Sequence, residues 1–171
     1  MAQSIILEIR QNLEQSRAET LSYLRSIDEP TALFRARPDA WSVKDHVIHM
    51  ADVEESVIHF SHRILHENCP ISPLCYDLAF NQDAWNNRGV AEKATYTWQQ
   101  TLQTLHHTRE ELYTLLGRIP EDALNRVGSH PVWGTPVTLA SVLRVPYRHE
   151  RAHRDEIAIL ASMSSQHESE N

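Results

Sequence analysis

The chain has 171 residues, of which 41% are hydrophobic, and a formal net charge of −7 at pH 7. This length suits one domain with its own hydrophobic core. The negative charge argues against a nucleic-acid groove, which needs clustered Lys and Arg, and no apolar run approaches the roughly 20 residues of a membrane span.

Apolar residues recur at helical spacing through most of the chain, and only four glycines interrupt it. The sequence therefore predicts an all-α protein. Four long helices are expected, over residues 3–27, 43–66, 97–117 and 138–162. Residues 67–96 are too long for a tight hairpin, although 78–94 can form a shorter helix, so we expect a four-helix bundle with a long crossover between helices 2 and 3.

Several residues predict where these helices begin and end. Ser42 with Asp45, and Thr97 with Gln100, have the spacing of N-terminal capping boxes, and Gly117 is a helix stop. Residues 118–137 are rich in turn formers. In the last helix, Pro146 lacks an N–H and should cause a local bend. We expect a single domain over residues 1–162, followed by a polar, disordered tail over 163–171.

The N-terminus lacks the basic segment and long apolar run of a signal peptide. Cys69 and Cys75 lie in one loop, and neither their number nor their spacing predicts a disulfide framework. We therefore expect a cytoplasmic protein with two free thiols.

The sequence contains 11 histidines, and two of them, His149 and His153, lie one turn apart on the last helix. Both imidazoles can therefore reach one metal ion. With Glu150 the stretch also matches the HExxH pattern of zinc proteases. The downstream ligand of those enzymes is missing, because Ile159 stands where the long form has histidine, and the remaining 18 residues are a helix end and a polar tail. We conclude that the stretch only resembles a protease motif.

Two other interpretations of this stretch remain open from the residues alone. His149 and His153 can be core histidines satisfied by hydrogen bonds, with Glu150 and Arg154 as a surface ion pair. Alternatively, packing of the second helix against the last one brings a third histidine opposite the pair. Both His46 and His49 lie near the apolar stripe of that helix, and periodicity does not choose between them.

The segment 40–54, which begins Ala-Trp-Ser, resembles the second-helix signature of the DinB-like superfamily, and 139–157 resembles its last helix. The resemblance covers about residues 1–162. It implies a divalent metal, nickel or zinc, held by His49, His149 and His153, with His46 as a neighbouring buried residue. This sequence departs from the family at Glu156, where glutamine is common; that carboxylate can approach the metal, hold a ligand's second nitrogen or remain solvated.

The family includes bacillithiol transferases and mycothiol-dependent isomerases, so the resemblance implies a small-molecule substrate. We also expect a homodimer. Our leading hypothesis is a metal-dependent enzyme that activates a small thiol or water for transfer or hydrolysis. Glu150 is the candidate general base because it adjoins a ligand, or else a surface ion-pair member. The alternative function is a non-catalytic, stress-associated dimeric bundle whose metal holds helices 2 and 4 together.

Overall fold

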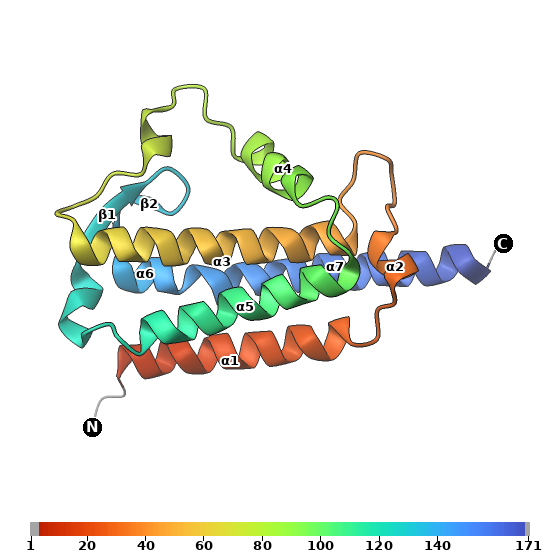
Figure 1. Cartoon of the computed structure of the whole chain (residues 1–171), viewed down its shortest axis with the longest axis horizontal. Helices are drawn as coiled ribbons and strands as arrows, with labels where there is room; N and C mark the ends of the chain where they lie inside the picture. Colours follow the sequence, from red (N-terminus) through yellow and green to blue (C-terminus); the bar gives the residue numbers. More distant parts are fainter. Residues whose placement is uncertain (1–3, 170–171) are drawn as a thin grey trace.

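The computed structural model describes residues 4–169, and four long helices lie side by side (Figure 1). They are α1 (Ile5–Leu24), α3 (Val43–His66), α5 (Trp98–Leu116) and α7 (Val145–Ser169). α3 packs on α5 and α7, and α1 closes the bundle against α7 and α5. The predicted four-helix bundle is confirmed; the predicted helix start at Gln3 lies outside the described residues.

Both predicted capping boxes form. Asp45 donates its backbone N–H to Ser42 Oγ at 3.2 Å, and Ser42 returns its own N–H to Asp45 Oδ2 at 2.8 Å. Gln100 and Thr97 exchange the same two bonds at 3.2 and 2.8 Å. These bonds satisfy donors that the first helical turn leaves unpaired, so α3 and α5 begin where the sequence predicts.

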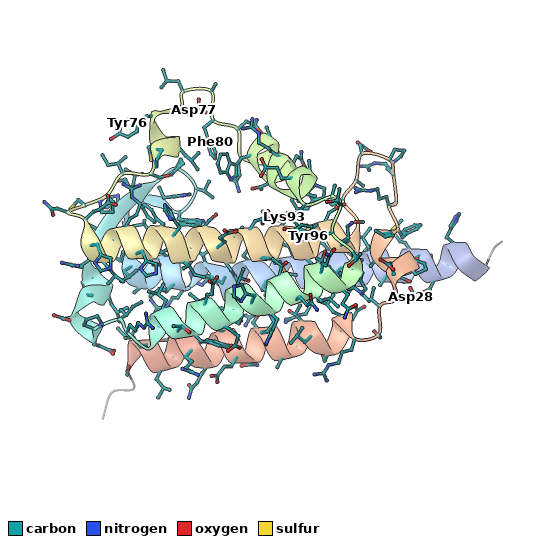
Figure 2. The ribbon with its side chains drawn as sticks, in the orientation of Figure 1. Asp28, Tyr76, Asp77, Phe80, Lys93 and Tyr96 are labelled. Atoms are coloured by element: carbon teal, nitrogen blue, oxygen red, sulfur yellow. The ribbon has the colours of Figure 1, made fainter. Side chains whose placement is uncertain are left out.

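The crossover between α3 and α5 holds the short helix η1 (Pro73–Tyr76) and α4 (Gln82–Glu92), so the predicted shorter helix is present. Figure 2 shows Tyr76 and Asp77 at its outer edge, and Lys93 and Tyr96 where it returns to the bundle. The return is anchored, because Lys44 Nζ donates to the carbonyls of Ala94 and Tyr96 at 2.9 and 2.8 Å. The crossover therefore arches over α3 and is held where it returns to the bundle.

The predicted turn-rich segment contains two strands, which the all-α prediction does not include. β1 (Val127–His130) and β2 (Gly134–Thr138) pair antiparallel. Each strand is too short to show a convincing alternation in the sequence, and β1 gains a second edge from the crossover. There Ser72 donates to the Ser129 carbonyl and Ser129 donates to the Pro70 carbonyl, both at 2.8 Å.

The predicted last helix is divided into α6 (Leu139–Leu143) and α7, with the break at Arg144. Pro146 has no N–H to donate to the Val142 carbonyl, which accounts for a break at this point. The predicted disordered tail is wrong for 163–169, because α7 continues to Ser169 and buries Ser164. α2 (Glu29–Leu33) packs against α7, and Phe34 contacts the His167 ring. Residues 170–171 lie outside the described range.

The core is divided into two apolar clusters by a layer of buried charges. One cluster includes Leu13, Val57 and Leu112; the other includes Leu24, Val47 and Leu105. Between them, every long helix contributes a charged side chain that is at most 5% exposed: Arg17, Glu54, Arg109 and Glu150. None of the described helices combines the length and apolar character of a membrane span.

Gly128 lies where β1 presses against α3, so Gly128→Ala is expected to lower the free energy of unfolding by about 1–3 kcal/mol. A Cβ at this position would approach Phe60 Cζ at 2.9 Å and the Pro70 carbonyl oxygen at 3.0 Å. Thermal or urea unfolding measures the loss. Gly117→Ala is the matched control, because its Cβ would meet no atom closer than 3.6 Å. Equal stabilities of the two variants would contradict the close packing of the hairpin.

Candidate metal centre

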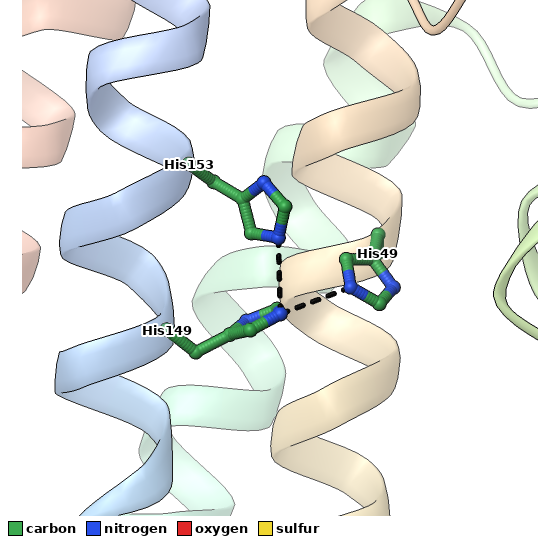
Figure 3. A group of neighbouring side chains, drawn as sticks. All are labelled: His49, His149 and His153. Carbon is green, nitrogen blue, oxygen red and sulfur yellow. Dashed lines mark hydrogen bonds between the residues drawn. The ribbon is translucent and has the colours of Figure 1, made fainter. Parts of the chain in front are cut away.

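Three histidines from two helices converge in the bundle (Figure 3). His149 and His153 project from successive turns of α7, and His49 faces them from α3. The Nε2 atom of His149 lies 2.9 Å from Nε2 of His49 and 3.0 Å from Nε2 of His153. The structure therefore brings together the three residues that the family resemblance selects, and it places His49 rather than His46 beside His149.

The donor set fits a shared cation better than mutual hydrogen bonds. An imidazole nitrogen holds either one proton or one lone pair in the ring plane. His149 Nε2 can therefore hydrogen-bond properly to only one of its two neighbours. Ligand nitrogens bound about 2.0–2.1 Å from one ion lie about 2.8–3.4 Å apart for angles between 90° and 109° at the ion. The two Nε2 separations of 2.9 and 3.0 Å fall within this range.

The electrostatic surroundings keep two of these rings neutral. Burial, together with neighbouring histidines, lowers the pKa of His49 to about 3 and that of His149 to about 3. A neutral imidazole presents a lone pair, which is the form that binds metals. The site is therefore prepared to receive a cation at neutral pH.

The second nitrogen of His153 faces Glu156. Nδ1 of His153 lies 2.5 Å from Glu156 Oε2, and Nδ1 of His46 lies 3.3 Å from the same oxygen and 3.1 Å from His153 Nδ1. A carboxylate only accepts, so His153 carries its proton on Nδ1 and keeps Nε2 free for a metal. The carboxylate thus holds the second nitrogen of a candidate ligand. These three residues are also close enough to share an ion, but the proton on His153 Nδ1 opposes that arrangement.

Glu156→Ala is expected to weaken zinc or nickel affinity by about 10–100-fold, because His153 loses the partner that orients its ring and selects its tautomer. Competition with a chromophoric chelator measures the affinity. Asp155→Ala is the matched control, since it removes the same charge from an exposed neighbour on the same helix. If both variants bind metal equally well, Glu156 is only a surface charge.

Trp41 covers the histidine cluster from the side of the crossover. Its ring centre lies 4.9 Å from that of His49 and 5.3 Å from that of His46, and its Nε1 donates to Asn87 Oδ1 on α4 at 2.7 Å. Trp41 therefore shields the rings from water and links them to the crossover. The sequence signature contains this tryptophan, but not its contact with α4.

Glu150 does not have the surroundings of a general base, and this prediction is corrected. Its Oε1 accepts from Arg17 Nε at 2.6 Å, and its Oε2 accepts from Arg109 Nη2 at 2.8 Å. Burial would raise the pKa of Glu150, but the two arginines outweigh it and hold the pKa below the ordinary value. The expectation of a surface pair with Arg154 is also wrong, because Arg154 pairs with Glu19 at 2.8 Å.

Glu150 is instead part of a buried network that joins all four long helices. Arg17 also donates to Glu54 Oε1 at 2.6 Å, Arg109 contacts Glu54, and Thr108 donates to Glu54 Oε2 at 2.9 Å. Sequence reasoning missed this network, although a signal was present: each of these charges interrupts the apolar stripe of its helix.

Two of the three clustered histidines, His49 and His149, line a cavity under the crossover. We name this the inner cavity; its volume is about 110 Å³, and His49, His149, Phe80, Trp85, His130 and Trp133 are among its lining residues. An outer cavity of about 480 Å³ adjoins it, lined by Asp52, Glu55, Arg63, Arg88 and other residues of α3 and α4. The two share Ser56, Leu74, Trp85 and His130. A small molecule in the inner cavity would lie beside the candidate metal site.

Comparison with known proteins identifies relatives of this architecture. The sequence profile of the DinB superfamily matches residues 12–157. YfiT from Bacillus subtilis, described as a probable metal-dependent hydrolase with an unusual four-helix bundle topology, superposes with a TM-score of 0.75 at 19% identity, covering 96% of this chain and 90% of its own. A search of curated proteins finds no significant match.

Two further solved structures share the fold. The four-helix bundle protein TT2238 has a TM-score of 0.63 at 20% identity and covers 90% of this chain and 98% of its own. An uncharacterised protein from Escherichia coli UTI89 has a TM-score of 0.70 at 12% identity and covers 96% of each chain. At these identities the likeness shows the fold alone.

Proposed function

This chain belongs to the DinB superfamily, and from that premise we propose that it is a metal-dependent hydrolase of a small molecule. His49, His149 and His153 would hold the divalent ion, for which nickel and zinc are the candidates because both accept imidazole ligands. The observation that carries the proposal is the convergence of three Nε2 atoms beside a cavity.

The ligand count favours catalysis over a purely structural metal. Within residues 4–169, the group around the three Nε2 atoms contains no fourth ligand atom from His, Cys, Asp or Glu. Structural zinc sites are closed by four protein ligands, whereas catalytic sites keep positions open. The non-catalytic alternative, in which the metal mainly joins α3 to α7, lacks the fourth ligand that it calls for.

Each protein group has a distinct role in this proposal. A bound divalent ion would polarise a carbonyl and lower the pKa of water. The three histidines would supply lone pairs to the ion. Glu156 accepts a hydrogen bond from Nδ1–H of His153 and fixes that ring. Trp41 packs over the rings and excludes bulk water. The inner cavity holds the substrate.

The test is hydrolysis of small aryl and alkyl esters and amides by protein loaded with Zn²⁺ or Ni²⁺. We expect turnover that a chelator abolishes and that added metal restores. If no substrate is hydrolysed and X-ray absorption shows four protein ligands, the protein is not this enzyme. A second set of assays offers bacillithiol or mycothiol together with electrophiles. If thiol conjugates form and no substrate is hydrolysed, the reaction is group transfer and not hydrolysis.

A further inference from the structure

The wall of the inner cavity, beside the candidate metal ligands, is rich in aromatic side chains. Aromatic rings from two separate segments line the cavity: Phe80 and Trp85 from the crossover, and Trp133 from the turn of the hairpin. Trp85 remains 48% exposed although it lines a concave surface. A large aromatic surface left open to water in a cavity is typical of a ligand site.

His130 adds one directed polar group to this wall. Its Nδ1 accepts the backbone N–H of Val132 at 3.3 Å, so the proton of the neutral ring lies on Nε2. The ring is clamped by a stack on Trp133, with centres 3.9 Å apart, and by an edge contact with Phe60 at 5.3 Å. His130 therefore offers a fixed N–H donor to the cavities that it lines.

Burial lowers the pKa of His130 to about 4, so the ring is neutral at pH 7. A neutral donor supplies no positive charge to offset the desolvation of a free carboxylate, and no Lys or Arg lines the inner cavity, so an uncharged acceptor such as a carbonyl oxygen fits the site better. The two cavities also differ in character, since charged residues such as Asp52, Glu55 and Arg88 belong to the outer one.

We propose that the inner cavity binds the aromatic group of an aromatic acyl compound, with Phe80, Trp85 and Trp133 around the ring and His130 Nε2–H donating to the carbonyl oxygen. The remainder of the compound extends into the outer cavity. The inner cavity's volume of about 110 Å³ limits this group to a single ring. The placement of a metal beside the carbonyl rests on the proposed function. The ring site itself does not.

The experiment compares benzohydroxamate with acetohydroxamate, which share one metal-binding group and differ in a phenyl against a methyl. Calorimetric titration of the zinc-loaded protein is expected to show benzohydroxamate binding at least about 10-fold more tightly. Trp85→Ala should abolish most of that preference. Tyr76→Ala is the matched control, because Tyr76 is exposed on the same crossover and lines neither cavity. Equal affinities for the two compounds would overturn the ring site.

His130→Phe keeps the stacked ring but removes the donor, so it should weaken both hydroxamates about fivefold, while His130→Gln, which retains an N–H, should weaken them less. No difference among these variants would overturn the donor role. Benzamide binding to metal-free protein, followed by tryptophan fluorescence, separates the two proposals. If benzamide binds, Trp85→Ala prevents its binding, and zinc makes benzohydroxamate bind no better than benzamide and leaves acetohydroxamate unbound, the metal function fails and the ring site stands. Loss of all binding overturns both.

Discussion

The His149→Ala variant is expected to lose more than about 100-fold in affinity for zinc and nickel. His149 is the central member of the cluster, since its Nε2 contacts those of both His49 and His153. Its removal leaves two nitrogens on different helices and opens a gap between them. Metal content of the purified protein and chelator competition both measure the loss.

His62→Ala is the matched control for this variant, because His62 is exposed and stacks on His66 on α3, away from the cluster. It should bind metal normally. His49→Ala and His153→Ala should each lose affinity as well. Full metal occupancy in all three cluster variants would show that the ion binds elsewhere and that the histidines only pack the bundle.

The Arg109→Ala variant is expected to lower the free energy of unfolding by about 3–5 kcal/mol, because it leaves two buried carboxylates with one arginine between them. Arg109 is 1% exposed and contacts Glu54 and Glu150. Burial would lower its pKa, but these two carboxylates outweigh that effect and raise the pKa above its usual value. Denaturant unfolding monitored by circular dichroism measures the loss.

Two comparisons make this prediction specific. Arg10→Ala breaks an exposed pair with Glu14 and should cost no more than about 1 kcal/mol. The double variant Arg109→Met with Glu54→Leu removes one charge of each sign and leaves the Arg17–Glu150 pair intact at 2.6 Å. It should be less destabilised than Arg109→Ala. If Arg109→Ala costs as little as Arg10→Ala, the network does not stabilise the bundle.

The family resemblance and local sequence signals together account for most of the helical frame and for the selection of the candidate metal-site residues. Ser42 with Asp45, and Thr97 with Gln100, determine their helix starts through contacts made within one turn. The spacing of His149 and His153 places them on one face of any helix that contains them. Such short-range features require no knowledge of the fold, so they can be predicted from the chain alone.

The choice between His46 and His49 depended on tertiary packing. Both residues are buried on α3, and both face α7. His49 lies beside Nε2 of His149, whereas His46 lies beside Nδ1 of His153. The difference comes from how α3 and α7 are rotated and set against each other. Local periodicity does not contain this information, and the family resemblance was needed to select His49.

The sequence by itself determined the caps, the helical frame and the histidine pair, because neighbours along one helix produce them. Only the tertiary structure decided that Glu150 belongs to a buried ion network, that the segment after α5 forms a hairpin and that His130 lines a cavity beside the candidate metal site. Glu150 meets Arg17 from another helix, and His130 meets Phe60 across the bundle surface. These contacts join residues that are far apart in the chain, and their partners are chosen by the packing of whole elements.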